Sequence, residues 1–282
     1  MYEVIFENDN GKKFVFGPGG NNWFGMNFGN GMEITLGKSQ GFAQIGETVE
    51  TQAVAGRPID VTGRFYGDIV ERKNALRNVC APLASGRLIF QKTYYTRVFV
   101  KAAPSFSPVK NNGLFRMQFY APYPFFYGFE ESYYRIGGMV PGFRFPVNYG
   151  QPHRFGTRNT ERYVNVINQG DVRVPYRMTI RSEGISTNAT ITNLTTFAFM
   201  RINGTIKSGE YITIYRDKNN VLRAELVSGD AVTDVITWID DDSSLFELDA
   251  GDNLISANDD EGGAAMVVSI TFNPAVGAIY ET

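Results

Sequence analysis

The sequence predicts a mainly β protein with two domains. The chain has 282 residues, more than one ordinary β-sandwich needs. Its 30 glycines and 14% aromatic residues favour many strands and turns. Its charge is also divided: residues 1–125 hold 14 Lys and Arg against 9 Asp and Glu (net +5), whereas residues 126–282 hold 13 against 20 (net −7). The low total charge of −2 argues against a sequence-specific nucleic-acid binder.

The first half begins as a series of strands. Apolar runs at 2–6 and 13–16 flank Asn10-Gly11, a hairpin signal, and a third run occupies 32–36. Residues 57–66, RPIDVTGRFY, alternate between apolar and polar side chains, which predicts a half-buried strand. Gly63 falls on the apolar face, so we expect a bulge or a close backbone approach there.

The period then changes to that of a helix. Asp68 followed by Glu71 resembles a capping box, and Pro82 provides a stop, so we predict a helix at about 69–80. Its outer face is basic, with Arg72, Lys73 and Arg77. Strands are expected again at 87–91, 94–100 and 113–120.

The stretch APYPFFYG at 121–128 concentrates aromatic rings beside Pro122 and Pro124. Proline is confined to strand edges and ends, so the ladder should stop near Ala121. The rings must then be buried by other groups, because a contiguous exposed aromatic patch is unusual in a monomer. Two interpretations remain open: a domain junction packed on its own neighbours, or a surface that another copy of the chain buries.

The second half predicts a module of a different kind. Residues 128–160 show no period and are interpreted as an aromatic-rich connector. Many short strands separated by turn signals indicate an antiparallel sandwich or jelly roll. These strands are expected at 161–168, 172–182, 187–194, 197–203, 209–215, 221–226, 234–239, 244–248, 252–256 and 264–272. The expected domains are 1–125, a connector at 126–160, and 161–282.

The residues that could support catalysis are few. His153 is the only histidine and Cys80 the only cysteine, and no spacing around them predicts a catalytic, cofactor or metal site. GMEITLGKS at 31–39 lacks the first glycine of a phosphate loop, because Met32 occupies that position. The acidic residues at 240–261 favour solvated turns, with calcium on a sandwich rim as the alternative. No membrane span and no signal peptide are predicted.

The order of motifs resembles one family. VTGRFYGDIVERKNALRNVCAPLASGRLIF, TRVFVKAAPSFSPV and GLFRMQFYAPYPFFYG follow one another in the first half. NQGDVRVPYRMTIRSEG, ATITNLTT, IKSGEYITIYRD and SSLFELDAGDNLISAN follow in the second half. This arrangement is similar to the distal tail protein of long-tailed (siphovirus-type) bacteriophages, along nearly the whole chain.

The resemblance implies a structural protein of the virion tail, assembled in the host cytoplasm, and not an enzyme. It implies an N-terminal β-sandwich or barrel-like ring domain, with six copies in the ring, and a C-terminal galectin-like β-sandwich. The implied partners are the tail tube protein, the tail-tip hub protein, and a receptor-binding protein or host glycan. The His and Trp/Glu/Arg ligand set of sugar-binding galectins has no counterpart around Trp238.

A closed ring requires one patch of each copy to bind a different patch of the next. Unpaired sheet edges, the basic helix face (Arg72, Lys73 and Arg77) and the aromatic run (Phe125 and Phe126) are the expected interface with a neighbour or the tube. The alternatives are a carbohydrate-binding protein for host cell-wall polysaccharide, with Trp238 or exposed tyrosines stacking on sugar, and a hydrolase of the host envelope.

Overall fold

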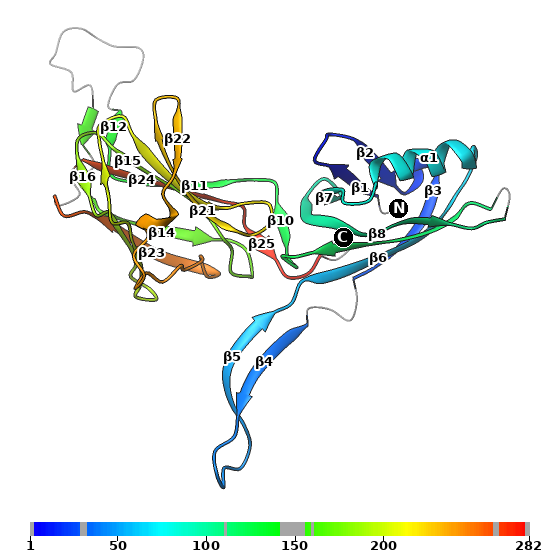
Figure 1. The fold of residues 1–282 in the computed structure, drawn as a ribbon, viewed down its shortest axis with the longest axis horizontal. Coiled ribbons are helices and arrows are strands. Elements are labelled where there is room, and N and C mark those ends of the chain that lie inside the picture. The colour runs from blue at the N-terminus through cyan, green and yellow to red at the C-terminus, as the bar shows by residue number, and fades with distance from the viewer. Residues whose placement is uncertain are drawn as a thin grey trace. The chain divides into compact units, whose positions relative to one another are not determined.

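The computed structural model divides the chain into two compact units (Figure 1). Unit 1 is Met1–Phe129 together with Val276–Thr282, and unit 2 is Glu130–Ala275. The residues that the structure describes are 3–28, 33–109, 112–141, 156–158, 161–261 and 265–279.

Unit 2 is therefore inserted between two parts of unit 1. The sequence boundaries at 125 and 160 place residues 276–282 in the second domain, and the structure differs from them at this point. The amino-acid composition does not change at the point where the chain re-enters unit 1. Val276 and Ile279 join unit 1 because their side chains pack against its core.

Within the described residues, unit 1 is built on one antiparallel sheet in the order β2-β1-β7-β8-β9-β6-β3, and β10 pairs with both β8 and β25. Strands β2 and β3 stay at the two ends of this path, so the sheet does not close into the expected barrel-like form. The strands are β1 (Val4–Asn8), β2 (Lys13–Phe16), β3 (Asn22–Asn27), β6 (Arg57–Phe65), β7 (Ser85–Phe90), β8 (Tyr94–Phe106), β9 (Leu114–Ala121) and β10 (Phe126–Gly128), with β25 (Ala275–Val276) at the boundary between the units. A short 3-10 turn at Pro18–Gly20 connects β2 to β3.

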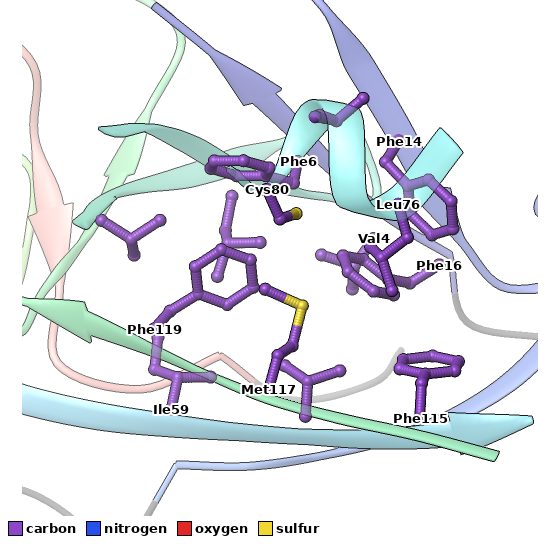
Figure 2. Close-up of a cluster of buried hydrophobic side chains, with 14 of the residues drawn as sticks. Val4, Phe6, Phe14, Phe16, Ile59, Leu76, Cys80, Phe115, Met117 and Phe119 are labelled. Carbon is purple, nitrogen blue, oxygen red and sulfur yellow. The ribbon is translucent and has the colours of Figure 1, made fainter. Parts of the chain in front are cut away.

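Phenylalanine side chains fill the core of unit 1 (Figure 2). Phe6 of β1 packs against Phe119 of β9, with 4.8 Å between the ring centroids. Phe65 of β6 stacks on Phe115 of β9 at 4.6 Å. These contacts join residues far apart in the sequence, so the core holds the first hairpin against the later strands.

Strand β6 confirms the alternation seen in its sequence. Its side chains are buried and exposed in strict turn, and Gly63 falls on the buried face. A Cβ atom at Gly63 would lie 2.5 Å from the Trp23 carbonyl oxygen and 2.5 Å from the Phe115 ring. The close backbone approach expected at this position is present.

The helix α1 (Ile69–Val79) covers this core. The Asp68 carboxylate accepts a hydrogen bond from the Glu71 amide at 3.0 Å, which satisfies one of the open donors at the helix N-terminus. Leu76 and Val79 are buried. Beyond the helix end, the Asn8 side chain donates to the Val79 carbonyl at 3.1 Å and so ties the first hairpin to α1.

Strands β4 (Ile34–Ser39) and β5 (Thr48–Val54) form a separate antiparallel hairpin within unit 1. In Figure 1 this hairpin extends away from the sheet that contains β6. We call residues 34–54 the arm. The sequence predicts its first strand at 32–36, but β5 was not expected.

Unit 2 contains two main antiparallel sheets, β11-β24-β15-β20-β21-β22 and β14-β23-β17-β18, and two short strand pairs, counted over its described residues. The first sheet consists of β11 (Ser132–Ile136), β24 (Met266–Phe272), β15 (Arg177–Ser182), β20 (Tyr211–Arg216), β21 (Leu222–Ser228) and β22 (Ala231–Asp234). The second consists of β14 (Tyr163–Asn168), β23 (Gly251–Asn258), β17 (Thr190–Asn193) and β18 (Ala198–Arg201). The pairs are β12 (Met139–Pro141) with β13 (Gly156–Arg158), and β16 (Ser186–Thr187) with β19 (Thr205–Ile206).

Three expectations for the second half need correction. The connector at 126–160 contributes β10 to unit 1 and β11, β12 and β13 to unit 2. Residues 234–239 form a 3-10 turn at Ile236–Trp238, because the Asp234 side chain accepts a hydrogen bond from the Ile236 amide. Residues 244–248 contribute an isolated bridge between Val174 and Leu248 and no strand.

A buried asparagine organises the turn that precedes β23. The Asn253 side chain donates to the carbonyl oxygens of Asp249 (2.8 Å) and Gly251 (3.1 Å), and its own oxygen accepts from the Asp249 amide at 3.0 Å. The Asn253 side chain is fully buried, so it depends on these partners for its hydrogen bonds.

We predict that Gly63→Ala destabilises unit 1 by about 1 to 3 kcal/mol, because the added methyl group overpacks the contact with Trp23 and Phe115. Chemical denaturation is followed by Trp23 fluorescence in a Trp238→Phe background. Gly25→Ala on β3 is the matched control, since its Cβ would meet only Thr62 Oγ1 at 3.9 Å. Equal unfolding midpoints for the two variants would contradict the prediction.

We predict that Asn253→Ala destabilises unit 2 by about 1 to 3 kcal/mol, because the partly buried Asp249 amide and the carbonyl oxygens of Asp249 and Gly251 lose the side chain that bonds to them. Trp238 fluorescence in a Trp23→Phe background reports on this unit. Asn165→Ala on the neighbouring strand removes an exposed bond to Asp252 and should shift the midpoint much less. If both variants lower the unfolding midpoint equally, the hydrogen bonds of Asn253 contribute no more to stability than an exposed bond does.

Candidate interaction surfaces

The arm presents apolar side chains to solvent along its length. Phe42 and Ile45 at its tip are fully exposed, with relative accessibilities of 106% and 102%. The other large exposed apolar side chains of the arm are Ile34, Leu36, Val49 and Val54. Every residue of β5 is exposed, so this strand has no core of its own to support it.

A two-stranded hairpin without a buried face is marginally stable by itself. Within the arm, Lys38 and Glu47 form a 2.7 Å ion pair, but both groups are solvent-exposed and such a pair adds little stability. An apolar hairpin of this kind is typical of a surface that a protein partner covers. The sequence contains a local signal for it: Gly41 and Gly46 bracket the apolar Phe42 and Ile45 between two runs of strand-forming residues.

The basic helix face is only partly free. The Lys73 ammonium donates to the Ser107 carbonyl at 3.5 Å and lies 5.7 Å from the centroid of the Phe106 ring, so it packs on β8 and its following loop. Arg77 bonds to Asn74 on its own helix at 3.2 Å. Arg72 is half-buried and Arg77 is exposed.

The aromatic segment divides between core and surface. Phe126 is buried, and Phe28, Phe90 and the Arg57 guanidinium surround its ring. Phe125 is half-buried and packs edge-on against Tyr123 at 5.3 Å. The structure therefore places Phe126 in the core of its own unit and leaves Phe125 partly accessible.

Arg57 links this segment to the returning chain. Its side chain is almost fully buried, and its guanidinium donates to the Gly277 carbonyl at 3.2 Å. Burial lowers the pKa of Arg57. The same side chain thus contacts the chain before unit 2, at Phe126, and the chain after it, at Gly277.

The acidic residues of unit 2 hold loops together. The Asp240 carboxylate accepts from Asn203 at 2.8 Å, and this bond lowers the pKa of Asp240. The Glu261 carboxylate accepts from the Thr187 amide at 2.7 Å, and hydrogen bonding to Thr187 lowers the pKa of Glu261. Among the described residues, no group of three or more His, Cys, Asp or Glu side chains is placed to hold a metal ion.

Trp238 has a packing role. Its ring lies against the backbone of Gly204, where an added Cβ would come within 2.2 Å of the ring. Its carbonyl accepts from the Asn203 amide at 2.6 Å. The ring is half-buried, so only part of it is accessible.

Of the two remaining residues that could take part in catalysis, one is buried and the other lies outside the described residues. Cys80 is buried in the core of unit 1, and burial raises the pKa of its thiol. His153 lies outside the described residues. A small, partly open pocket of about 30 Å³ lies beside Tyr176 in unit 2. None of the helices in the described ranges is long and apolar enough to cross a membrane.

Comparison with known protein families identifies a segment of unit 2. Residues 169–275 match the family model of the siphovirus-type tail component, C-terminal domain. The resemblance found in the sequence is thereby confirmed for this segment of unit 2. A search of curated proteins by sequence found no match.

The fold of the whole chain is that of a solved phage protein. SPP1 Dit (gp 19.1), described as a paradigm of the hub adsorption apparatus in phages that infect Gram-positive bacteria, aligns with a TM-score of 0.60 and 12% identity. The alignment covers 97% of this chain and 99% of SPP1 Dit. Chains of the phage P2 baseplate in its activated conformation, with Ca and with Sr, align at 14% identity over 96% of this chain and 97% of theirs. Their TM-scores of 0.44 and 0.43 are too low to support an argument.

Proposed function

We propose that the protein is a structural component of a phage tail tip. Copies of unit 1 close into a ring, with six copies as the expected number, and the ring joins the tail tube to the tip hub and host-adhesion apparatus. The protein acts by geometry and performs no covalent chemistry. The match of residues 169–275 to a tail-component family and the fold shared with SPP1 Dit support this assignment.

The exposed apolar arm is the structural feature that best supports a ring. A closed ring needs two different patches on each copy, because a patch that binds itself gives only a dimer. The arm supplies one patch, an apolar projection, and the sheet of unit 1 supplies another at β3, the last strand of its order within the described residues, where Trp23 is exposed. Docking the arm on a neighbour buries apolar groups of both copies.

The free energy of burying the arm decides whether this contact can hold two copies together. Complete burial of one phenylalanine or isoleucine side chain contributes about 1.5 to 3 kcal/mol. Phe42 and Ile45 together would therefore contribute about 3 kcal/mol or more for each contact, more than a hundredfold in the association constant.

We predict that Phe42→Ser with Ile45→Ser lowers the particle mass. Light scattering on a sizing column should give about 189 kDa for six copies of the 31.5 kDa chain, and a value near 31.5 kDa for the double variant. Leu83→Ser is the control, because it removes an equally exposed apolar side chain from outside the arm. A double variant with wild-type mass would exclude the arm as the ring contact, and a wild-type monomer at every concentration would exclude the ring itself.

The basic helix supplies a second test. We retain Arg72 and Arg77 as proposed contacts to a neighbour or to the tail tube, and Phe125 as a weaker one. Lys73 and Phe126 are left out because their side chains pack within their own unit. Arg72→Glu with Arg77→Glu should reduce particle mass or block joining to isolated tail tubes.

The control for the helix variant is Lys12→Glu with Lys92→Glu. These two exposed lysines of unit 1 lie in turns outside α1, so the control changes the total charge by the same amount. If both variants assemble and join tubes like the wild type, the helix face is only a solvated surface.

A further inference from the structure

The outer face of the larger sheet of unit 2 has a chemistry unlike that of the arm. Along β15, Met178 and Ile180 point into the core, so the alternate residues Arg177, Thr179 and Arg181 lie on the outer face. Both arginines are exposed. Four residues of extended strand place them about 13 Å apart.

Each of these arginines stacks on a tyrosine of β20. The Arg177 guanidinium carbon lies 4.7 Å from the Tyr215 ring centroid, and that of Arg181 lies 5.6 Å from the Tyr211 ring centroid. Stacking fixes the plane of a guanidinium group and leaves the N–H donors at its edge free. In the described part of the chain, no carboxylate forms an ion pair with either arginine.

Hydroxyl groups occupy the sheet between the two arginines. Thr179 pairs with Ser269 of β24 on one side and with Thr213 of β20 on the other. Arg135 of β11 is paired with Ser269 and adds a third exposed cation to the same row. Thr213 is buried, so the surface presents three guanidinium groups around the hydroxyls of Thr179 and Ser269.

An acidic group on this face is already engaged. Glu225 of β21 pairs with Thr213 in the register, and its carboxylate accepts a hydrogen bond from the Tyr215 hydroxyl at 2.9 Å. Arg223, opposite Tyr215, is paired with Asp217 at 3.2 Å. The three cations of β11 and β15 are thus the charges left to attract a ligand.

We propose that this face, centred on Arg177, Thr179 and Arg181, binds a phosphate-bearing, hydroxyl-rich polymer. Guanidinium groups recognise phosphate oxygens through paired N–H donors, and the Thr and Ser hydroxyls exchange hydrogen bonds with polyol hydroxyls. Because the tyrosine rings hold the arginines in place, little side-chain entropy is lost on binding.

The polarity of the face favours a polymer of this class over a protein surface. Protein interfaces have an apolar centre and a polar rim. Here the centre consists of Thr179 and Ser269, whereas the arm exposes large apolar side chains. The face is also a local basic patch within residues 126–282, whose net charge is −7, so the attraction is confined to the sheet.

The biological source of the polymer rests on the proposed function, since a tail-tip protein would meet such a polymer at a host cell surface. The binding chemistry is independent of the ring. Its test therefore measures ligand affinity by calorimetry on the full chain, and light scattering on the same samples reports particle mass separately.

The test compares three probes of similar length: oligomers of glycerol phosphate, neutral dextran and polyglutamate. We expect the glycerol phosphate oligomer to bind most tightly, and Arg177→Gln with Arg181→Gln to weaken its binding at least tenfold. Thr179→Val should weaken it less, by removing one hydroxyl. The matched control is Arg162→Gln with Arg173→Gln, which removes two charges beside Asn258 and Asp249 and should change affinity less than twofold.

Each result decides the proposal. No binding of glycerol phosphate oligomer, or equal loss in the control, would overturn it. Equal affinity for polyglutamate would overturn it in favour of an acidic protein partner, and equal affinity for dextran would show that charge does not carry recognition. A change of particle mass in the Arg177/Arg181 variant without a change of affinity would make the face a contact between copies.

Discussion

The packing of phenylalanine rings between the first hairpin and strands β6 and β9 is the contact on which unit 1 depends. Phe6 and Phe119 join β1 to β9, and Phe65 and Phe115 join β6 to β9. Because β6 continues from the arm, the same core that fixes β6 also anchors the base of the arm. The arm projects from a rigid strand although it has no core of its own.

The two units carry surfaces of opposite character. Unit 1 exposes apolar side chains on a hairpin, where burial against protein is favourable. Unit 2 exposes stacked arginines and hydroxyls on a flat sheet, where a charged, hydrated ligand fits better than an apolar one. Under the two proposals, one part of the chain assembles while another recognises a ligand.

Local patterns in the sequence predict the elements with a clear period. The alternation at 57–66 predicts β6, and Asp68 with Pro82 predicts α1 to within one residue at its end. Features that depend on contacts between distant residues are not predicted from the sequence. Val276 joins unit 1 because of a core that other strands form. The sequence around Phe126 does not show that its side chain is buried. The apolar run at 121–128 cannot distinguish core from interface, because both bury rings. The arginine face was missed because its tyrosine partners lie on another strand.

The insertion of unit 2 has a mechanical consequence. Two covalent passages of the chain connect the units, one after β10 and one at β25, and these strands pair with each other. A pulling load on unit 2 is shared between both passages, and Arg57 bridges their anchoring points at Phe126 and Gly277. Cutting either passage alone therefore leaves unit 2 covalently attached to unit 1.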